Sequence, residues 1–265
     1  MGAASDAADW WATSVTRIEP GVIEHRGIPV QDLIGTTSFA EMVWLMVRGD
    51  RPDELQAALL EAALVASTDH GPQAPSIAIS RMAITCGVGI NNAMASAVNV
   101  LGDVHGGAGE QCLELLDEIV ARATPDGDWD RAAEECVTRF RQTRRHVPGF
   151  GHRFHPVDPR RAPLLALVEA TREAGSVAGQ HLEAGLAIER LLARGRDRGV
   201  PMNIDGATAI IYGELGFPAA LARGLFILSR SVGILAHAWE EKEAGSRLKG
   251  PIPPSILPTY VPPQA

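Results

Sequence analysis

Leucine and alanine recur at helical spacing through most of this 265-residue chain, and this periodicity limits the folds that it can adopt. The segment DELQAALLEAALVAS shows the pattern most clearly. Aromatic residues make up only 5% of the chain, a composition that favours packed helices over sheets. We therefore expect an all-α fold with few strands or none. Further helices are expected at 108–123, 128–142, 161–173, 177–194, 205–215 and 218–243.

Local signals set the ends of the first clear helices. Ser38 and Glu41 have the spacing of a capping box, in which each side chain bonds the backbone of the other residue. A helix should follow and end at Gly49. Pro52 is expected in the first turn of the next helix, which makes 38–67 a helical hairpin.

The segments outside the regular pattern give three further expectations. Residues before Ser38 are expected to be irregular. The small-residue stretch 76–101 predicts one tightly packed core helix, in which Gly87 and Gly89 permit close approach or a kink. The tail KGPIPPSILPTYVPPQA is too rich in proline to be helical, so we expect an extended arm whose apolar side chains favour packing.

Charge and cysteine content argue against several classes of function. The net charge of -8, from 24 basic and 32 acidic residues, gives no general attraction to nucleic acid or anionic lipid. The three cysteines have no CxxC spacing, and the first residues lack the pattern of a secretion signal, so a reduced, cytoplasmic protein is expected. Charged residues or glycine interrupt each apolar run before about 20 residues, so no membrane partner is expected.

A first polar cluster, GDVHGGAGE at 102–110, places His105 before two glycines at the start of a predicted helix. Gly106 and Gly107 would let the backbone come close to a ligand. Free amides at the helix start would favour an anion or a developing oxyanion. A simple turn before the helix is the alternative interpretation.

The second cluster is the loop VPGFGHRFHPVDPRR at 147–161, within a stretch from Arg139 that holds seven arginines and three histidines. Arginine forks bind carboxylates or phosphates in a fixed orientation. Alternatives are a solvated basic face, and a surface ion pair between Asp158 and an arginine. The candidate side chains of the loop are His152, Arg153, His155, Arg160 and Arg161.

The third cluster, NIDG at 203–206, places Asp205 at the start of a predicted helix. By local rules alone, Asn203 or Asp205 is an N-cap that satisfies free helix amides. No HExxH motif or close pair of His and carboxylate at ligand spacing is present, so no metal site is predicted.

Taken in order, GDVHGGAGE, VPGFGHRFHPVDPR and NIDG resemble the three active-site signatures of the citrate synthase family. The resemblance extends over nearly the whole chain, through EHRGIPVQDLIGTTSFAEMVWLMVRGDRP near the start and ILSRSVGILAHAWEE near the end. The segment Asp69–Pro72, DHGP, is closer to the citryl-CoA lyase module of ATP-citrate lyase than to most synthases.

This resemblance implies an all-helical homodimer, with each chain divided into two domains around the active site. The large domain would comprise 1–107 and 217–265, and the smaller, mobile domain 108–216. The substrates it implies are an acyl-CoA and a 2-oxo acid or citrate. Coenzyme A enters as a thioester substrate, and no permanently bound cofactor is expected.

The resemblance also implies roles for single residues. Asp205 would take a proton from the methyl group of acetyl-CoA, and His105 would hydrogen-bond the thioester oxygen as the enolate forms. His152 would polarise the keto group of an oxaloacetate-like acceptor. Its carboxylates would be held by His70, Arg160, Arg230 and, from a neighbouring subunit, Arg247 with Lys249 as the next candidate. Coenzyme A would be held by Arg153 and by backbone at Gly106, Gly107, Gly149 and Gly151.

Several functional alternatives remain open at this point. The loop from His152 to Arg160 is one residue shorter than in typical synthases, and the position expected for a phosphate-binding arginine falls near His155 or Pro156, which leaves Arg153 as a possible substitute. The DHGP segment and the short chain favour a citryl-CoA lyase over a citrate synthase, which also hydrolyses the thioester. A non-catalytic CoA-binding paralogue and a helical interaction scaffold are the alternatives from other classes.

Overall fold

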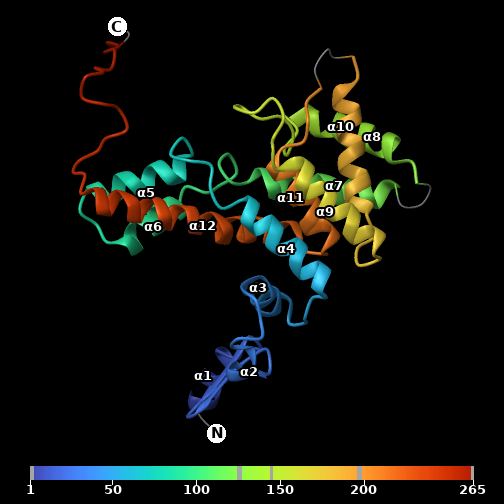
Figure 1. Cartoon of the computed structure of the whole chain (residues 1–265), viewed down its shortest axis with the longest axis horizontal. Coiled ribbons are helices and arrows are strands. Elements are labelled where there is room, and N and C mark those ends of the chain that lie inside the picture. The colour runs from blue at the N-terminus through green and yellow to red at the C-terminus, as the bar shows by residue number, and fades with distance from the viewer. Residues whose placement is uncertain (1–2, 124–126, 144–145, 196–198, 264–265) are drawn as a thin grey trace.

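In the computed structural model, residues 3–123, 127–143, 146–195 and 199–263 are described, and these residues form twelve helices and three short strands (Figure 1). The expected helical fold is confirmed in its main part, although the strands make the chain mainly helical rather than all-α. The first elements are α1 Ala3–Trp10, β1 Thr16–Glu19, β2 Val22–His25, β3 Ile28–Pro29, α2 Val30–Leu33, α3 Phe39–Arg48 and α4 Glu54–Ala66. The remaining helices are α5 Pro75–Thr85, α6 Ile90–Val98, α7 Ala108–Ala123, α8 Trp129–Thr143, α9 Arg161–Glu173, α10 Gln180–Ala193, α11 Ile204–Glu214 and α12 Ala219–Ala244.

The strands lie in the region that was expected to be irregular. They form an antiparallel sheet in the order β1-β2-β3, with Thr16 opposite His25 and Glu19 opposite Val22. This part of the chain stands away from the helical body in Figure 1 and leaves Trp10 and Trp11 exposed. The strands are only two to four residues long, too short to give a clear alternating pattern in the sequence.

The helical hairpin forms as predicted, with one shift at the second helix. The Ser38 hydroxyl accepts from the Glu41 N–H at 3.2 Å, Glu41 accepts from the Ser38 N–H at 2.7 Å, and Gly49 ends α3 with a φ of 88°. The start of α4 was placed too early, because Asp53 and not Pro52 is the boundary residue. The Asp53 carboxylate accepts from the N–H of Gln56 at 2.8 Å and forms a second capping box.

The prediction of one helix at 76–101 is wrong, because the chain turns there and forms α5 and α6. Gly87 has a φ of 88°, which glycine adopts without the steric cost of a side chain. The two helices lie side by side along α12 (Figure 1). They bury Ile77, Ala93 and Ala97, while other side chains of both helices remain exposed within this chain. The segment is therefore only partly core.

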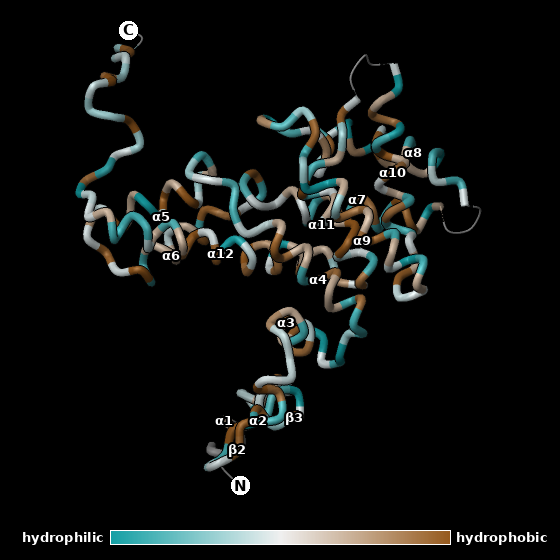
Figure 2. The backbone as a smooth tube through the Cα atoms, in the orientation of Figure 1, coloured by the Kyte–Doolittle hydropathy of each residue, from teal (hydrophilic) through white to brown (hydrophobic). Residues whose placement is uncertain are grey.

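The main core lies among α3, α4 and the helices from α7 to α12. Helix α11 is at its centre and is buried from Gly206 to Gly213. Small residues allow the helices to approach closely, since a side chain at Gly185 of α10 would lie 2.5 Å from Ile210 of α11. The tube of α11 is correspondingly apolar in Figure 2. Rigid packing of this kind fixes the first turn of α11, which carries Asp205.

Helix α12 packs along α5 and α6 over one part of its length and against α4 and α7 over another (Figure 1). It is long and apolar enough, by length and composition alone, to cross a membrane. The sequence expectation that no apolar run reaches such a length does not hold by this measure. However, Arg230 is 6% exposed, Glu241 is 0% exposed, and the helix contacts α4, α5, α6 and α7. Buried charges with hydrogen-bond partners, on a helix that packs against several others, are typical of a helix within a protein body, although one face of α12 stays exposed within this chain.

After α12 the chain becomes an extended arm, as its prolines predicted (Figure 1). The Leu248 N–H donates to the carbonyl of Thr85 at 3.0 Å and fixes the start of the arm. Beyond this point Ile256, Leu257 and Tyr260 are exposed. Packing of the arm on a second subunit, the homodimer, the domain division and domain mobility all stay predictions.

Candidate active site

Nine of the predicted site residues meet at one cleft of about 450 Å³. They come from five separate stretches: the loop before α5, the loop before α7, the loop before α9, the first turn of α11 and the middle of α12. They are His70, His105, Gly106, Gly151, His152, Arg153, Arg160, Asp205 and Arg230. The fold therefore collects residues that are far apart in the sequence at a single concave surface.

Asp205 lies in the first turn of α11. Asn203 is the N-cap, as one local interpretation predicted, and its side chain accepts from the N–H groups of Asp205 at 2.9 Å and Gly206 at 3.3 Å. The Asp205 carboxyl is thus free of the capping task. Burial raises the pKa of Asp205, while Arg160 and Arg230 act in the opposite direction. A carboxylate with a raised pKa is a stronger base than an exposed one.

His105 precedes α7 and is held by the first turn of α5. Its Nε2 accepts from the backbone N–H of Ser76 at 3.2 Å and lies 3.0 Å from the Ser76 hydroxyl. Because Nε2 accepts a hydrogen bond, neutral His105 carries its hydrogen on Nδ1. Burial, with a smaller effect from Arg230, lowers the pKa of His105. His105 is therefore a neutral donor at physiological pH, and Ser76 is a site residue that the sequence did not reveal.

His152 has the opposite tautomer. Its Nδ1 accepts from the backbone N–H groups of Phe154 at 3.0 Å and His155 at 3.1 Å. Neutral His152 therefore carries its hydrogen on Nε2. Burial, followed by the nearby His155, lowers the pKa of His152. The local turn after Gly151 thus fixes a second neutral donor at the cleft.

Two further histidines, His70 and His155, gather beside His152. The ring of His70 lies 5.1 Å from that of His152 and 5.6 Å from that of His155, between centroids. One nitrogen of each ring falls within 4.8 Å of the others, which is a spacing that could hold a metal ion. The bonds to His152 Nδ1 oppose this use, because its other nitrogen then carries hydrogen and has no lone pair for an ion. The cluster fits hydrogen bonding to a polar substrate better than metal coordination.

Asp158 organises the loop from inside the protein, so the surface ion pair considered from the sequence is corrected to a buried one. Asp158 is 2% exposed and accepts both Nε and Nη2 of Arg160 at 2.9 Å. It also accepts the N–H of Ile204 at 3.0 Å, which joins the loop to α11. Burial raises the pKa of Asp158, but the bonds from Arg160 and Ile204 outweigh it and lower the pKa to about 2. Asp158 therefore fixes Arg160 and the start of α11 together.

Arg230 brings a buried positive charge to the cleft from α12. Its Nε donates to the carbonyl of Ser67 at 3.2 Å, and its guanidinium lies 4.9 Å from the ring centre of Phe226. Burial lowers the pKa of Arg230, with Asp69 and Asp205 acting in the opposite direction. A partly desolvated guanidinium next to a cleft suits the binding of a carboxylate.

Three predicted site residues do not line the cleft. A side chain at Gly107 would lie 2.7 Å from the backbone of Asp103, and one at Gly149 would lie 2.6 Å from Cys112 Sγ. Glycine is therefore needed at both positions because other parts of this chain pack too closely there for a side chain. Arg247 lies in the arm after α12, and its proposed contact with a neighbouring subunit stays a prediction.

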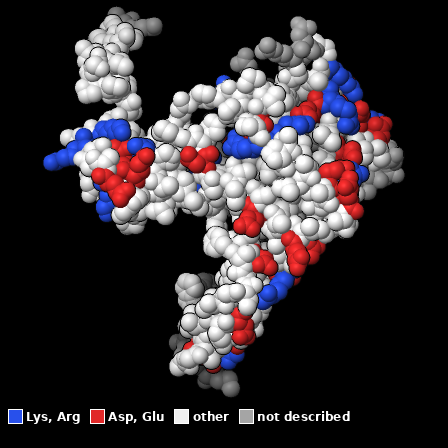
Figure 3. Space-filling view, viewed as in Figure 1, with Lys and Arg blue, Asp and Glu red and all other residues white. Residues whose placement is uncertain are grey.

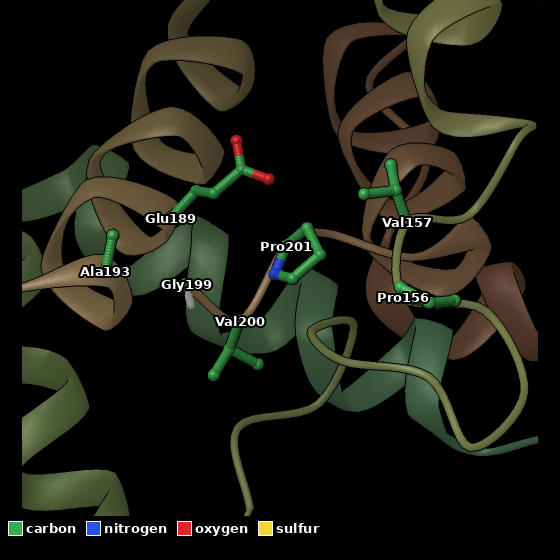
Figure 4. A pocket seen from close by; sticks show the side chains of 7 residues that line it. All are labelled: Pro156, Val157, Glu189, Ala193, Gly199, Val200 and Pro201. Carbon is green, nitrogen blue, oxygen red and sulfur yellow. The ribbon is translucent and has the colours of Figure 1, made fainter. Parts of the chain in front are cut away.

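A second cavity, of about 510 Å³, opens between Pro156–Val157 and Val200–Pro201 (Figure 4). Among the described residues that line it, Glu189 is the only charged one. That carboxylate accepts Arg161 Nε at 2.9 Å and the Met202 N–H at 2.8 Å. These described lining residues offer no unengaged group for catalysis, and the histidine-lined cleft is the candidate active site.

The arginine-rich stretch is not a free basic face. Arg160 pairs with Asp158, Arg161 with Glu189, and Arg139 with Glu118. Figure 3 shows basic and acidic side chains next to one another on this face of the molecule. Arg144 and Arg145 lie outside the described residues. Exposed Arg153 remains a candidate for binding a phosphate at the rim of the cleft.

Comparison with known proteins identifies the family. Residues 46–252 match the sequence pattern described as the citrate synthase C-terminal domain. The chain is 32% identical over 200 residues to the citrate synthase of Haloferax volcanii, covering 75% of this chain and 50% of that protein. The chain therefore belongs to the citrate synthase family. It spans about half the length of the synthases that it matches in sequence.

Solved structures give the same family and a more specific likeness. The structure of citryl-CoA lyase from Hydrogenobacter thermophilus matches with a TM-score of 0.81 and 28% identity, covering 96% of each chain. ATP citrate lyase from Methanothrix soehngenii, solved with citrate and coenzyme A, matches with a TM-score of 0.81 at 21% identity, covering all of this chain and 45% of that one. The likeness to the second protein concerns the fold. The first match agrees with the resemblance to citryl-CoA lyases that the DHGP segment indicated.

Proposed function

We propose that this chain is a citryl-CoA lyase, which cleaves citryl-CoA to acetyl-CoA and oxaloacetate and catalyses the reverse condensation. The observation that carries the proposal is the meeting of a partly buried carboxylate with two neutral histidine donors, Asp205, His105 and His152, at one cleft. Carbon–carbon bond formation next to a thioester needs this set: one base and a donor for each oxygen that gains charge.

In the condensation direction, Asp205 takes a proton from the methyl carbon of acetyl-CoA. The thioester oxygen gains negative charge as the enolate forms, and the Nδ1–H of His105 stabilises it. The enolate carbon then attacks the keto carbon of oxaloacetate, whose oxygen accepts the Nε2–H of His152. That oxygen takes up the Nε2 proton of His152 and becomes the tertiary hydroxyl of citryl-CoA; solvent then returns a proton to His152 and removes the one held by Asp205. Cleavage runs the same steps in reverse, with protonated Asp205 returning the proton to carbon.

The carboxylates of the substrate would bind to His70, Arg160 and Arg230. Arg160 is fixed by its fork to Asp158 and Arg230 by its bond to Ser67, so both cations are held in place before substrate arrives. Such preorganisation reduces the entropy lost on binding and orients the keto group. Arg153 at the rim would contact the phosphates of coenzyme A.

A citrate synthase that also hydrolyses citryl-CoA is the second candidate, because the relatives found by sequence are synthases at about 30% identity. The lyase is favoured by the match over 96% of both chains to a citryl-CoA lyase. The placement of His70 of the DHGP segment at the cleft also agrees with it. The two reactions share every residue described above and differ in whether water attacks the thioester.

The test incubates the purified protein with citryl-CoA and follows the products by mass spectrometry, beside a free-thiol assay. A lyase releases acetyl-CoA and oxaloacetate without free coenzyme A, whereas a synthase releases citrate and free coenzyme A. No product in either assay, in the presence of folded protein, would contradict the catalytic proposal and leave the non-catalytic paralogue.

We also propose that the chain acts as a cytoplasmic homodimer. Leu228, Val232, Leu235 and Trp239 follow one another at helical spacing along α12 and are all exposed within the single chain. A stripe of this kind, together with the apolar arm, is typical of a surface that a second subunit covers. Sedimentation velocity on the purified protein tests this, and a monomer at micromolar concentration would contradict it.

A further inference from the structure

Helix α12 holds the loop that carries His70 at three successive turns. The three contacts bring Arg230 to Ser67, Gly233 to Thr68 and His237 to Asp69. The middle contact needs a glycine, since a side chain at Gly233 would lie 2.3 Å from the Thr68 carbonyl oxygen. The last contact joins His237 Nε2 to Asp69 Oδ2 at 3.2 Å, immediately before His70 in the chain.

The hydrogen-bond direction in this last contact is fixed by a third residue. Arg81 of α5 places Nη1 3.0 Å from His237 Nδ1, and a guanidinium can only donate. His237 Nδ1 is therefore the acceptor, and the hydrogen of neutral His237 is on Nε2, where it is donated to Asp69. Arg81 is itself held by Glu240 and by Glu241, whose carboxylate lies 2.6 Å from Arg81 Nη2.

Asp69 in turn holds the backbone on the other side of His70 by a hydrogen bond. The same Oδ2 accepts the N–H of Gly71 at 3.0 Å, so the Asp69 side chain spans His70 from one neighbour to the other. Burial raises the pKa of Asp69, but the bonds from Gly71 and His237 outweigh it, and the net pKa is below the ordinary value. Asp69 is thus an anion held by two donors, and its bond to the Gly71 N–H closes the turn around His70.

We propose that His237 and Asp69 are positioning residues for His70, holding its ring where it receives a substrate carboxylate. This inference rests on the proposed function, in which His70 binds that carboxylate. Neither residue lines the cleft, and both act through the turn Asp69–Gly71. Loosening the turn therefore changes substrate binding more than the chemical step, which Asp205 and His105 perform.

Two replacements of His237 separate positioning from packing. H237Q keeps a donor for Asp69 and an acceptor for Arg81, as neutral His237 has, whereas H237F keeps the ring and removes both bonds. The matched control is H181F, because His181 of α10 forms a similar pair with Asp117 of α7 at 2.9 Å and is not part of the cleft. Thermal unfolding of all three variants shows whether each is folded.

The first measurement is steady-state kinetics in the condensation direction. A bond of this kind contributes about 1.4 kcal/mol, so we expect the KM for oxaloacetate to rise roughly tenfold in H237F, with kcat changed much less. H237Q should stay close to wild type in both constants, as should H181F. An unchanged KM in H237F, or an equal loss in H237Q, would overturn the inference.

The second measurement needs no substrate and keeps this inference separate from the proposed function. Diethylpyrocarbonate modifies histidine rings, and peptide mass spectrometry reports the rate at His70 alone. The rate should increase several-fold in H237F and stay at the wild-type value in H237Q. Wild-type protein that neither condenses nor cleaves refutes the proposed function. Equal rates at His70 in all variants refute the positioning role.

Discussion

A close backbone approach beside the cleft gives a stability prediction that can be worked out from distances. Gly149 has a φ of 82°, and a side chain there would lie 2.6 Å from Cys112 Sγ and 2.8 Å from the Cα of Gly206. Alanine at this φ costs about 1 kcal/mol, and overpacking at such distances adds about 2 kcal/mol. G149A should therefore destabilise the protein by about 3 kcal/mol.

The control for this prediction is Gly175, which has the same φ of 82° and nothing within 4 Å of an added side chain. G175A therefore carries the backbone cost without the packing cost. In thermal unfolding followed by circular dichroism, G149A should lower Tm by roughly 6–12 °C and G175A by roughly 2–4 °C. Equal shifts in the two variants would refute the close packing of the loop on α11.

Two further predictions follow from the cleft and one from the apolar stripe of α12. The pKa of Asp158 is lowered to about 2 in the folded state. Its contribution to the free energy of unfolding is therefore fully present above the unfolded pKa near 4, and it is lost as pH falls from there toward 2. Urea unfolding should show a loss of about 2 kcal/mol over this range in wild type and a smaller loss in D158N; identical pH profiles would contradict the buried pair. R153A should raise the KM for the coenzyme A substrate while leaving the KM for oxaloacetate near its wild-type value, and initial-rate kinetics would show the reverse if Arg153 bound the acceptor. W239E should weaken or abolish the dimer in sedimentation velocity, because it places a charge in the apolar stripe of α12, and an unchanged sedimentation coefficient would place the dimer contact elsewhere.

Local sequence signals predicted the elements whose ends are set by nearby residues. The capping box of Ser38 and Glu41 depends on residues three apart, and it formed as expected. At the break between α5 and α6 the sequence predicted no more than a close approach or a kink, because Gly87 permits a turn without specifying its direction. The short strands were missed because their pairing depends on a sheet that lies largely outside the core.

The cleft residues were found from the motifs, whereas the contacts that fix them were not. Ser76 bonds His105 across 29 residues, and Asp69 meets His237 across 168. Such contacts depend on how the helices pack and leave no local pattern. Asp158 was considered as a surface partner of arginine because the sequence does not show which side of a loop is buried.

The central claim is that Asp205 exchanges a proton with the methyl carbon of acetyl-CoA. The most direct measurement is cleavage of citryl-CoA in D2O, with the acetyl-CoA product analysed by mass spectrometry for wild type and D205N. The structure predicts that wild type forms acetyl-CoA with one deuterium in its methyl group. Asparagine cannot deliver the proton, so D205N should be slower by a factor on the order of 10² to 10⁴. Equal rates and equal labelling in the two proteins would contradict the assignment of Asp205.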